Sequence, residues 1–258
     1  MKISLHLIPS EIQKQYNANF NETTQERFEH LTDSELSIEG FSFYTSVSAV
    51  FSSKIEGVDI ELDSYLQHKR FGKKYLPDYT RKIDDLYDAY AFAKQTKLSG
   101  KSLEQAHKKL TAHILQKSQQ GKIRTGNMFV VTDEGKIEYV ATSGDKVKSE
   151  VKKYYSDIET LLNLELTFKE VLFFASMLHL VFVKIHPFED GNGRAGRLLE
   201  KWFIAEKLGP KAWFIQSEKY YYEQHDMYYH NIRRLGLEYE ELNYSESLPF
   251  LQMLPNSI

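Results

Sequence analysis

Residues 186–197 read His-Pro-Phe-Glu-Asp-Gly-Asn-Gly-Arg-Ala-Gly-Arg, and they directly follow a 15-residue apolar-rich stretch, Val171–Ile185. Because the residue before a proline is disfavoured in helical dihedrals, Pro187 predicts that the apolar helix ends at His186 and presents the imidazole there. Gly191–Gly193 supply permissive backbone, and a new helix is predicted to begin directly after them. Since the N–H groups at a helix N-terminus bind anions, the stretch predicts a helix–loop–helix unit with an anion site in its loop.

The side chains of this stretch are those that phosphate chemistry needs. Asp190 is a hard oxygen ligand suited to Mg²⁺ beside phosphate. Arg194 and Arg197 lie three residues apart on one helix face, where both guanidinium groups can grip phosphate oxygens. His186 titrates near neutrality and is a candidate general base. Each residue alone is more often structural, but their joint spacing indicates a phosphoryl- or nucleotidyl-transfer site.

Every fixed position of a known signature is met in this stretch. The signature His-x-Phe-x-Asp/Glu-Gly-Asn-Gly-Arg-x-x-Arg defines the Fic (filamentation induced by cAMP) family, which residues 186–197 closely resemble. The resemblance extends over roughly residues 38–254, although only the motif is highly specific. It implies a Fic-type helical core and the family's usual activity, which is Mg²⁺-dependent transfer of AMP from ATP to a Ser, Thr or Tyr hydroxyl of a target protein.

The resemblance also implies a role for each motif position. His186 would deprotonate the target hydroxyl, and Asp190 would hold Mg²⁺ between the α- and β-phosphates of ATP. The nucleotide-binding residues would be Gly191, Asn192 and Gly193 around the phosphates, with Arg194 and Arg197 on the β- and γ-phosphates. Attack at the α-phosphorus would release pyrophosphate, with positioning and charge neutralisation supplying most of the catalysis.

The most informative segment outside the motif is a helix predicted over residues 38–55, which Gly57 is placed to cap. Glu56 lies in the last turn, where the helix dipole disfavours an anion, and Ser52 lies one turn earlier on the same face. Taken alone, Glu56 is an ordinary exposed acid before a glycine. Beside the motif, the segment resembles the family's inhibitory pattern, Ser/Thr-x-x-x-Glu-Gly/Asn, which implies that Glu56 pairs with Arg197 and blocks productive placement of the γ-phosphate.

A β-hairpin is predicted from two β-rich runs, 127–131 and 137–141, around an Asp-Glu-Gly turn within 132–136. Two strands alone have unpaired edges, and an edge beside an active site can bind an extended segment by strand addition. The hairpin resembles the flap on which family members dock the target backbone, so the expected docking residues are Asn127, Met128, Phe129 and Val130. Family flaps often carry a proline-rich end, whereas this chain has Tyr-Val-Ala-Thr at 139–142.

Tyrosines are abundant, 17 in all, and most are expected to pack between helices. By their order along the chain, Tyr228 and Tyr229 resemble the family's tyrosine pair beside the adenine, where ring stacking and a phenolic hydrogen bond would contribute. His107 and His179 lie in apolar helical contexts, and both are interpreted as structural.

The rest of the chain favours helices, with only 13 glycines and 6 prolines in the whole sequence. Ser102 and Gln105 stand at capping-box spacing at the start of one of them. The further helices predicted from periodicity are 21–31, 62–68, 83–96, 102–116, 146–162, 167–185, 194–208, 217–235 and 246–254. The sequence thus predicts an all-α, mainly helical fold with one β-hairpin and no linker, divided into an N-terminal helical extension (1–80, with the inhibitory helix at about 38–57) and a Fic domain (81–258).

Composition excludes several other classes of protein. The 258 residues are 41% hydrophobic and 27% charged, which is enough for a buried core and excludes wholesale disorder. A net charge of -3 gives no basic field for nucleic acid, and the absence of cysteine removes disulfide scaffolds, thiolate zinc sites and cysteine nucleophiles. No signal peptide is evident, and residues 171–185 are too few to span a bilayer. We therefore expect a soluble cytoplasmic protein without direct nucleic-acid or membrane binding.

The leading hypothesis is a self-inhibited protein adenylyltransferase. One alternative is an enzyme that works mainly in reverse and removes AMP from a modified hydroxyl, with Glu56 orienting a water. A second alternative is transfer of a different phosphate-linked group, because the motif contacts the phosphates and the metal more than the nucleobase of the donor. The third is a non-catalytic nucleotide-sensing interaction module, against which intact His186 and Asp190 argue. The target protein, the direction of reaction, the release of inhibition and assembly into a homo-oligomer stay open.

Overall fold

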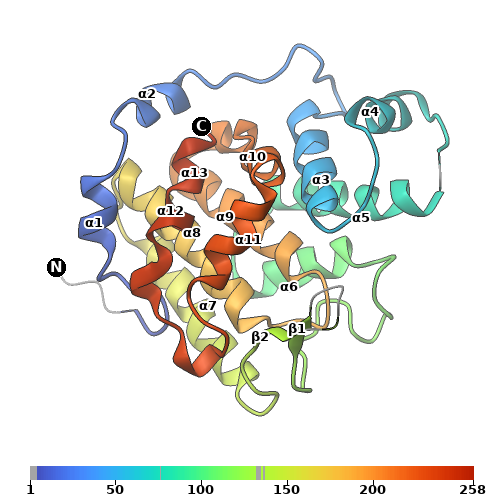
Figure 1. Ribbon diagram of the computed structural model, residues 1–258. Helices are drawn as coiled ribbons and strands as arrows, with labels where there is room; N and C mark the ends of the chain where they lie inside the picture. The colour runs from blue at the N-terminus through green and yellow to red at the C-terminus, as the bar shows by residue number, and fades with distance from the viewer. Residues whose placement is uncertain (1–4, 76, 132–134, 136) are drawn as a thin grey trace.

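The computed structural model describes residues 5–75, 77–131, 135 and 137–258, and it is mainly helical with one small antiparallel sheet (Figure 1). The predicted fold class is confirmed. The α-helices and strands are, in chain order, α1 (Gln13–Ala18), α2 (Thr23–Glu29), α3 (Phe43–Ile55), α4 (Leu62–Phe71), α5 (Pro77–Lys94), α6 (Gly100–Leu110), β1 (Phe129–Val131), β2 (Ile137–Val140), α7 (Val147–Asn163), α8 (Phe168–Ile185), α9 (Asn192–Leu208), α10 (Ser217–Glu223), α11 (His225–Arg233), α12 (Leu248–Leu251) and α13 (Met253–Asn256). Three short 3-10 helices are η1 (Pro210–Phe214), η2 (Tyr239–Glu241) and η3 (Tyr244–Ser247). Within the described ranges, no helix is long and apolar enough to cross a membrane.

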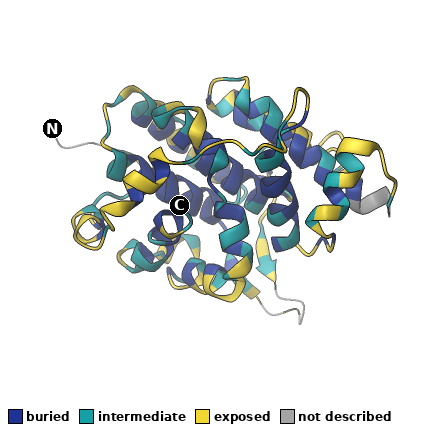
Figure 2. Cartoon of the chain, turned by 90° about the horizontal axis from the view of Figure 1, so that it is seen from above, coloured by how far each residue is buried: buried dark blue, intermediate teal, exposed yellow. Residues whose placement is uncertain are grey.

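The helix α8 forms the centre of the core because it is apolar on nearly every side. A capping box between Thr167 and Glu170 fixes its start. Every residue from Val171 to Ile185 is buried, and Figure 2 shows the interior helices in the colour of buried residues. The helix α9 packs against α8 so closely that a Cβ on Gly196 would lie 2.9 Å from the His179 ring. This close packing places the two helices of the predicted helix–loop–helix unit side by side.

The helix α3 begins later than predicted. Ser42 is its N-cap and accepts a hydrogen bond from the backbone N–H of Thr45, so the helix starts at Phe43 and not at residue 38. Ile38 and Phe41 instead exchange two backbone hydrogen bonds, of 3.0 and 2.9 Å, around Gly40, whose φ is +78°. The chain has turned before the helix begins, and only residues 43–55 of the predicted segment are helical.

The N-terminal region reaches both sides of the molecule. In Figure 1 the chain runs from α1 and α2 across the top to α3 and α4 on the other side. The helices α1 and α2 pack on α8 and η1, whereas α3 packs on α5 and α10. The Asp157 carboxylate accepts the backbone N–H groups of His6 and Leu7, each at 2.7 Å. A single buried cluster runs from Ile8 to Leu254. The division into residues 1–80 and 81–258 remains a prediction.

The helix predicted over 102–116 is shorter and starts earlier, as α6. Ser99 is the N-cap, and its capping box is formed with Ser102, so the predicted box of Ser102 and Gln105 is wrong. The helix ends at Leu110, and the C-cap residue Thr111 donates its hydroxyl hydrogen to the His107 carbonyl at 2.7 Å. Beyond that point the chain proceeds in turns.

The single helix predicted over 217–235 is two helices, α10 and α11, that break at Gln224 (φ -108°, ψ 36°). The break lets the rings of Tyr221 and Tyr228 stack with centroids 5.0 Å apart. Residues seven apart in one straight helix are separated by about 10 Å along its axis, so a continuous helix would not allow this stacking. The helix predicted at 21–31 is shorter and corresponds to α2. The helix predicted at 246–254 is divided into η3, α12 and α13, and α1 was not predicted.

The predicted hairpin is present as the antiparallel pair β1 and β2, with a register irregularity between Val130 and Val131. Most of its turn, 132–134 and 136, lies outside the described residues. The outer edge of β2 is partly covered, because the N–H of Val140 donates to the Leu237 carbonyl at 2.8 Å and Val140 forms a parallel bridge with Glu238. The hairpin is thus joined to the segment that follows α11.

Candidate active site

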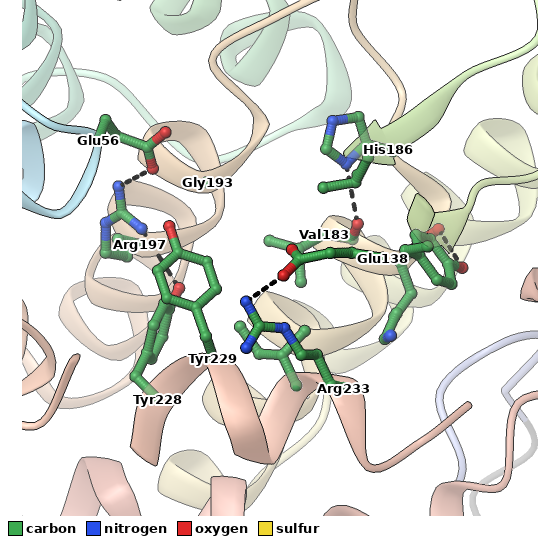
Figure 3. A pocket seen from close by; sticks show the side chains of 13 residues that line it. Glu56, Glu138, Val183, His186, Gly193, Arg197, Tyr228, Tyr229 and Arg233 are labelled. Carbon is green, nitrogen blue, oxygen red and sulfur yellow. Dashed lines mark hydrogen bonds and ion pairs between the residues drawn. The ribbon is translucent and has the colours of Figure 1, made fainter. Parts of the chain in front are cut away.

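His186 is the C-cap of α8, in a left-handed backbone conformation. Its φ of 52° and ψ of 61° lie in the left-handed region, and it is the one non-glycine residue with positive φ in the described part of the chain. The helix ends where Pro187 predicts, but in a left-handed turn instead of an extended one. The ring Nδ1 lies 3.2 Å from the Val183 carbonyl oxygen, an acceptor, so Nδ1 donates the proton and Nε2 is left as the basic nitrogen (Figure 3). Burial lowers the pKa of His186 below its ordinary value, which favours the neutral base.

The loop that follows His186, residues 187–191, is held in place by contacts with His107 of α6. The rings of His107 and Phe188 stack with centroids 3.6 Å apart. The His107 Nδ1 accepts the N–H of Gly121 at 3.0 Å, so Nε2 donates to the Asp190 carbonyl at 2.8 Å. Burial lowers the pKa of His107 to about 4, which keeps this ring neutral. The interpretation of His107 as structural agrees with these contacts, and they show that its structural role is to hold the motif loop.

Gly191 and Asn192, which were expected to lie around the phosphates, also stabilise the conformation of the loop. The Asn192 side chain brackets the backbone of Phe188, accepting from its N–H and donating to its carbonyl, each at 2.9 Å. Gly191 has φ +80°, and a Cβ there would lie 2.9 Å from the Thr111 side chain, so glycine is required. The Asn192 side chain is therefore committed to the loop, and only the backbone at 191–193 is left to face an anion.

Arg194 and Asp190 lie together at the start of α9. The Arg194 Nη2 donates to the Asp190 Oδ1 at 3.1 Å, and Asp190 is half exposed while Arg194 is buried. The Arg194 Nε is buried without an acceptor among the residues that the structure describes. A buried N–H without a partner is costly, so this atom is suited to a ligand oxygen.

Arg197 is held by the helix α3. Its Nη2 donates to the Glu56 Oε1 at 2.6 Å and to the Ser52 carbonyl at 3.0 Å, and its Nε donates to the Ser52 Oγ at 2.9 Å. The contact expected between Glu56 and Arg197 is therefore present, across 141 residues of sequence (Figure 3). Gly193 makes room for it, because a Cβ there would lie 2.5 Å from the Glu56 Oε1.

Glu56 and Arg197 each stabilise the charged form of the other. Burial alone would raise the pKa of the Glu56 carboxyl, but the guanidinium groups of Arg197 and then Arg194 outweigh it and lower that pKa. Burial would likewise lower the pKa of Arg197, and Tyr228 and Glu56 outweigh it and raise that pKa. Glu56 is thus a carboxylate at neutral pH, and its 24% exposed side chain pairs with an arginine that is only 1% exposed.

Glu56, Arg197 and His186 line one cavity of about 170 Å³, whereas Asp190 and Arg194 are not among its lining residues. Figure 3 shows the Glu56–Arg197 pair at one side of it and His186 at the other. The cavity is lined by Glu56, Val130, Glu138, Tyr139, Val183, Lys184, His186, Gly193, Arg197, Tyr228, Tyr229, Ile232 and Arg233. An ion pair between Glu138 and Arg233, with N and O 2.5 Å apart, ties the hairpin to α11 at this cavity.

Both predicted tyrosines reach the cavity, in different ways. Tyr228 is 1% exposed, and its hydroxyl accepts the Arg197 Nη1–H at 3.3 Å. Its main polar contact at the cavity is therefore with this arginine. Burial raises the pKa of Tyr228 to about 12, so the phenol stays protonated. Tyr229 is half-buried and lines the cavity with its ring.

The predicted docking residues are only partly at the cavity. Val130 lines it, and Phe129 beside it is 51% exposed on the outside of β1. Asn127 accepts the N–H of Gly144 at 2.9 Å, and the Met128 carbonyl accepts the N–H of Ala141 at 3.1 Å, so both residues close the base of the hairpin.

Sequence reasoning missed the residue that joins the hairpin to His186. The Arg124 guanidinium donates to the carbonyls of His186 at 2.7 Å, Gly126 at 2.5 Å and Thr142 at 2.6 Å, and more weakly to Ile185 at 3.3 Å. The acceptors include residues on both sides of the hairpin and the end of α8. A lone arginine before a predicted hairpin carries no sequence signal for this role, because all its partners are backbone carbonyls.

Comparison with known proteins agrees with this geometry. Residues 97–204 match the model of the Fic/DOC family, and the matched region contains the whole motif. Residues 97–204 thus form a Fic/DOC family domain. Its fold resembles that of a Fic family protein from Desulfovibrio desulfuricans G20 (TM-score 0.74, 18% identity), with 99% of this chain and 73% of that chain covered.

Two further solved structures share the Fic fold. One is a Fic domain containing signaling protein from Bacteroides thetaiotaomicron VPI-5482, with TM-score 0.65, 14% identity, and coverage of 96% of this chain and 91% of that one. The other is Fic-1 from C. elegans, with TM-score 0.65, 17% identity, and coverage of 95% of this chain and 68% of that one. At these identities the likeness concerns the fold.

A curated protein also matches part of the sequence. The ribonucleoside-diphosphate reductase small chain of Ostreid herpesvirus 1 (isolate France) is 29% identical over 125 residues. The match covers 46% of this chain and 21% of the viral protein, so the chain spans only about a fifth of the length of that relative.

Proposed function

We propose that this Fic protein transfers AMP from ATP to a Ser, Thr or Tyr hydroxyl of a target protein, and that Glu56 inhibits the reaction. One observation carries the proposal. His186, Gly193, Arg197 and Glu56 line a single cavity that Val130 of the hairpin also borders. Base, anion-binding helix start, phosphate-binding arginine and inhibitory carboxylate would thus act on one bound nucleotide.

The reaction follows from the tautomer of His186. Its Nε2 takes the proton of the target hydroxyl while the oxygen attacks the α-phosphorus of ATP. A new O–P bond forms as the bond between the α-phosphorus and the bridging oxygen of pyrophosphate breaks, and pyrophosphate leaves. The Val183 carbonyl, which accepts from Nδ1, holds the ring in the tautomer that leaves Nε2 available. The first-turn N–H groups of α9 and the unpartnered Nε of Arg194 would hold phosphate oxygens.

Asp190 fits a role in Mg²⁺ binding. No cluster of three or more potential metal ligands occurs among the described residues, so a cage made of protein alone is not available. Mg²⁺ beside nucleotides is commonly bound by one or two carboxylates together with phosphate oxygens, and the half-exposed Asp190 supplies such a carboxylate. When bound, Mg²⁺ would neutralise charge on the phosphates.

Inhibition follows from the donors of Arg197. A guanidinium has five N–H donors, of which Ser52 takes two and Tyr228 takes one. Glu56 takes a fourth with a charged contact. A γ-phosphate would have to displace this carboxylate, or bind beside it with like charges close together, so ATP would bind weakly or with its α-phosphate misplaced for in-line attack.

The reverse reaction is a second candidate, favoured by the place of Glu56. Its carboxylate lines the same cavity as His186 and is partly exposed. A carboxylate there could orient a water toward the phosphorus of a modified hydroxyl and so remove AMP.

Incubation of wild type and Glu56→Gly with lysate and ATP labelled at the α-phosphorus tests the proposal. Label on protein with Glu56→Gly, and little with wild type, is the expected result. Loss of label from pre-labelled protein with wild type but not with Glu56→Gly would favour the reverse reaction. Binding of ATP by both proteins without any turnover would contradict both reactions and favour a nucleotide-sensing module.

A further inference from the structure

A chain of four buried side chains ends on Arg197. The Glu200 Oε2 lies 2.9 Å from the His179 Nδ1, the His179 Nε2 lies 3.0 Å from the Tyr228 hydroxyl, and that hydroxyl lies 3.3 Å from the Arg197 Nη1. None of the four residues is more than 1% exposed. The chain connects the facing helices α8 and α9 with α11, and it reaches the cavity only at Arg197 and Tyr228.

The proton positions in this chain follow from what each group can do. A carboxylate only accepts and a guanidinium only donates, so the two ends of the chain are fixed. The His179 Nδ1 therefore carries a proton and donates to Glu200. In a neutral ring the Nε2 then accepts, and the Tyr228 hydroxyl donates to it. The free lone pairs of the Tyr228 oxygen face Arg197, whose Nη1–H donates to them. Every group in the chain is satisfied in this one arrangement.

The opposite tautomer leaves a buried group unpaired. If the His179 Nε2 carried the proton, both it and the Arg197 Nη1 would donate to the Tyr228 oxygen. The phenolic hydrogen would then lose its acceptor, and the His179 Nδ1 would face a carboxylate with two acceptors and no proton between them. An unsatisfied buried polar group costs about 1–3 kcal/mol. The Glu200 carboxylate thus sets the direction of all three hydrogen bonds.

We propose that Glu200 and His179 are positioning residues that act through Tyr228 to hold the Arg197 guanidinium in place for phosphate. The inference rests on the proposed binding of ATP at this arginine. Ser52 holds the Nε edge of Arg197, and Tyr228 holds its Nη1. When Glu56 leaves, the guanidinium therefore stays in place, with up to two N–H groups pointing at the cavity. Release of inhibition then uncovers an arginine that is already oriented.

The hydrogen bonds from Arg197 through Tyr228 and His179 to Glu200 are called the relay below. The tautomer of His179 tests the relay without any dependence on ATP. In ¹⁵N NMR spectra of the histidine-labelled wild-type protein, assigned by single substitutions among its nine histidines, the shifts of the two ring nitrogens report which one carries the proton. We expect a neutral ring protonated at Nδ1 and not at Nε2. A ring protonated at Nε2, alone or as the imidazolium, would overturn the relay whatever the protein does with ATP.

A double-mutant cycle tests the effect on the nucleotide. In the Glu56→Gly background, His179→Phe and Tyr228→Phe should each weaken ATP binding in calorimetry by about tenfold. The double variant should also lose about tenfold, because His179 acts only through the Tyr228 hydroxyl. An additive loss of about a hundredfold, or an unchanged affinity for His179→Phe, would overturn the relay.

Tyr154→Phe is the matched control. The Tyr154 hydroxyl is also buried and donates to the Leu178 carbonyl at 2.6 Å, one residue from His179, but it has no contact with the relay. Its removal should weaken the fold by a similar amount and leave ATP affinity within about twofold. Absence of ATP binding by Glu56→Gly itself would count against the proposed function, and the NMR result would then decide the relay alone.

Discussion

Replacement of Glu56 by glycine should strengthen ATP binding by an amount that the structure sets. Glu56 and Arg197 form a charged hydrogen bond of 2.6 Å to an arginine that is 1% exposed. A hydrogen bond to a charged group contributes about 1.5–3 kcal/mol. If ATP must displace the Glu56 carboxylate, binding to wild type costs this free energy, and binding to Glu56→Gly does not. The Kd for ATP should therefore fall by about 10- to 150-fold, at 1.4 kcal/mol per tenfold. Transfer of AMP should rise by at least about tenfold in parallel.

The measurement is calorimetric titration of wild type and Glu56→Gly with ATP and Mg²⁺. Glu61→Gln is the matched control, because Glu61 is 77% exposed and pairs with Lys54 at the surface at 3.0 Å, and its affinity should stay within about twofold of wild type. Arg197→Ala should not reproduce the gain, since it removes the phosphate contact together with the inhibitory one. Equal Kd values for wild type and Glu56→Gly across ATP and Mg²⁺ concentrations would refute the reasoning.

Three further predictions concern the catalytic groups, all measured in the Glu56→Gly background. Asp190→Asn should remove both transfer and its dependence on added Mg²⁺, and activity that persists in excess EDTA would contradict the metal assignment. Arg124→Met should lower kcat by about 100-fold and leave the Kd for ATP within a few-fold, because it frees the hairpin and the His186 carbonyl but no nucleotide contact; a changed Kd with an unchanged kcat would contradict its positioning role. In a pH profile of kcat, transfer should be constant near pH 7 and fall only below about 6.5, because burial lowers the pKa of His186 and the base is lost when pH drops through that value. Removal of the Glu56 charge lowers the same pKa further, so a loss of activity that begins above pH 7 would argue against His186 as the base.

The parts of this fold that the sequence predicts are those with local causes. Pro187 predicts the end of α8, whose last residue is Ile185 and whose C-cap is His186. The glycines at 191 and 193 predict the start of α9 to within two residues, because the helix begins at Asn192 and not at 194. The apolar run of α8 similarly predicts the centre of the core. The contact of Glu56 with Arg197 was expected only through the resemblance to a family, since no local rule joins residues 141 apart.

The parts that the sequence does not predict depend on distant partners. Arg124 and His179 are ordinary in sequence, and their roles appear only when α8, α9 and the hairpin come together. The start of α6 depended on a choice between two serines, Ser99 and Ser102, that both suit an N-cap. The break at Gln224 has no glycine or proline to mark it, and it accompanies the stacking of two tyrosine rings.

The central claim is that His186 attaches AMP to a hydroxyl, and two positions of label in ATP test it most directly. Glu56→Gly is incubated in parallel with ATP labelled at the α-phosphorus and ATP labelled at the γ-phosphorus, with Glu56→Gly/His186→Ala beside it. The account predicts that protein gains label from the α-phosphorus only, and that the double variant gains neither while it still binds ATP. Label from the γ-phosphorus, or α-label that survives His186→Ala in a folded protein, would contradict it.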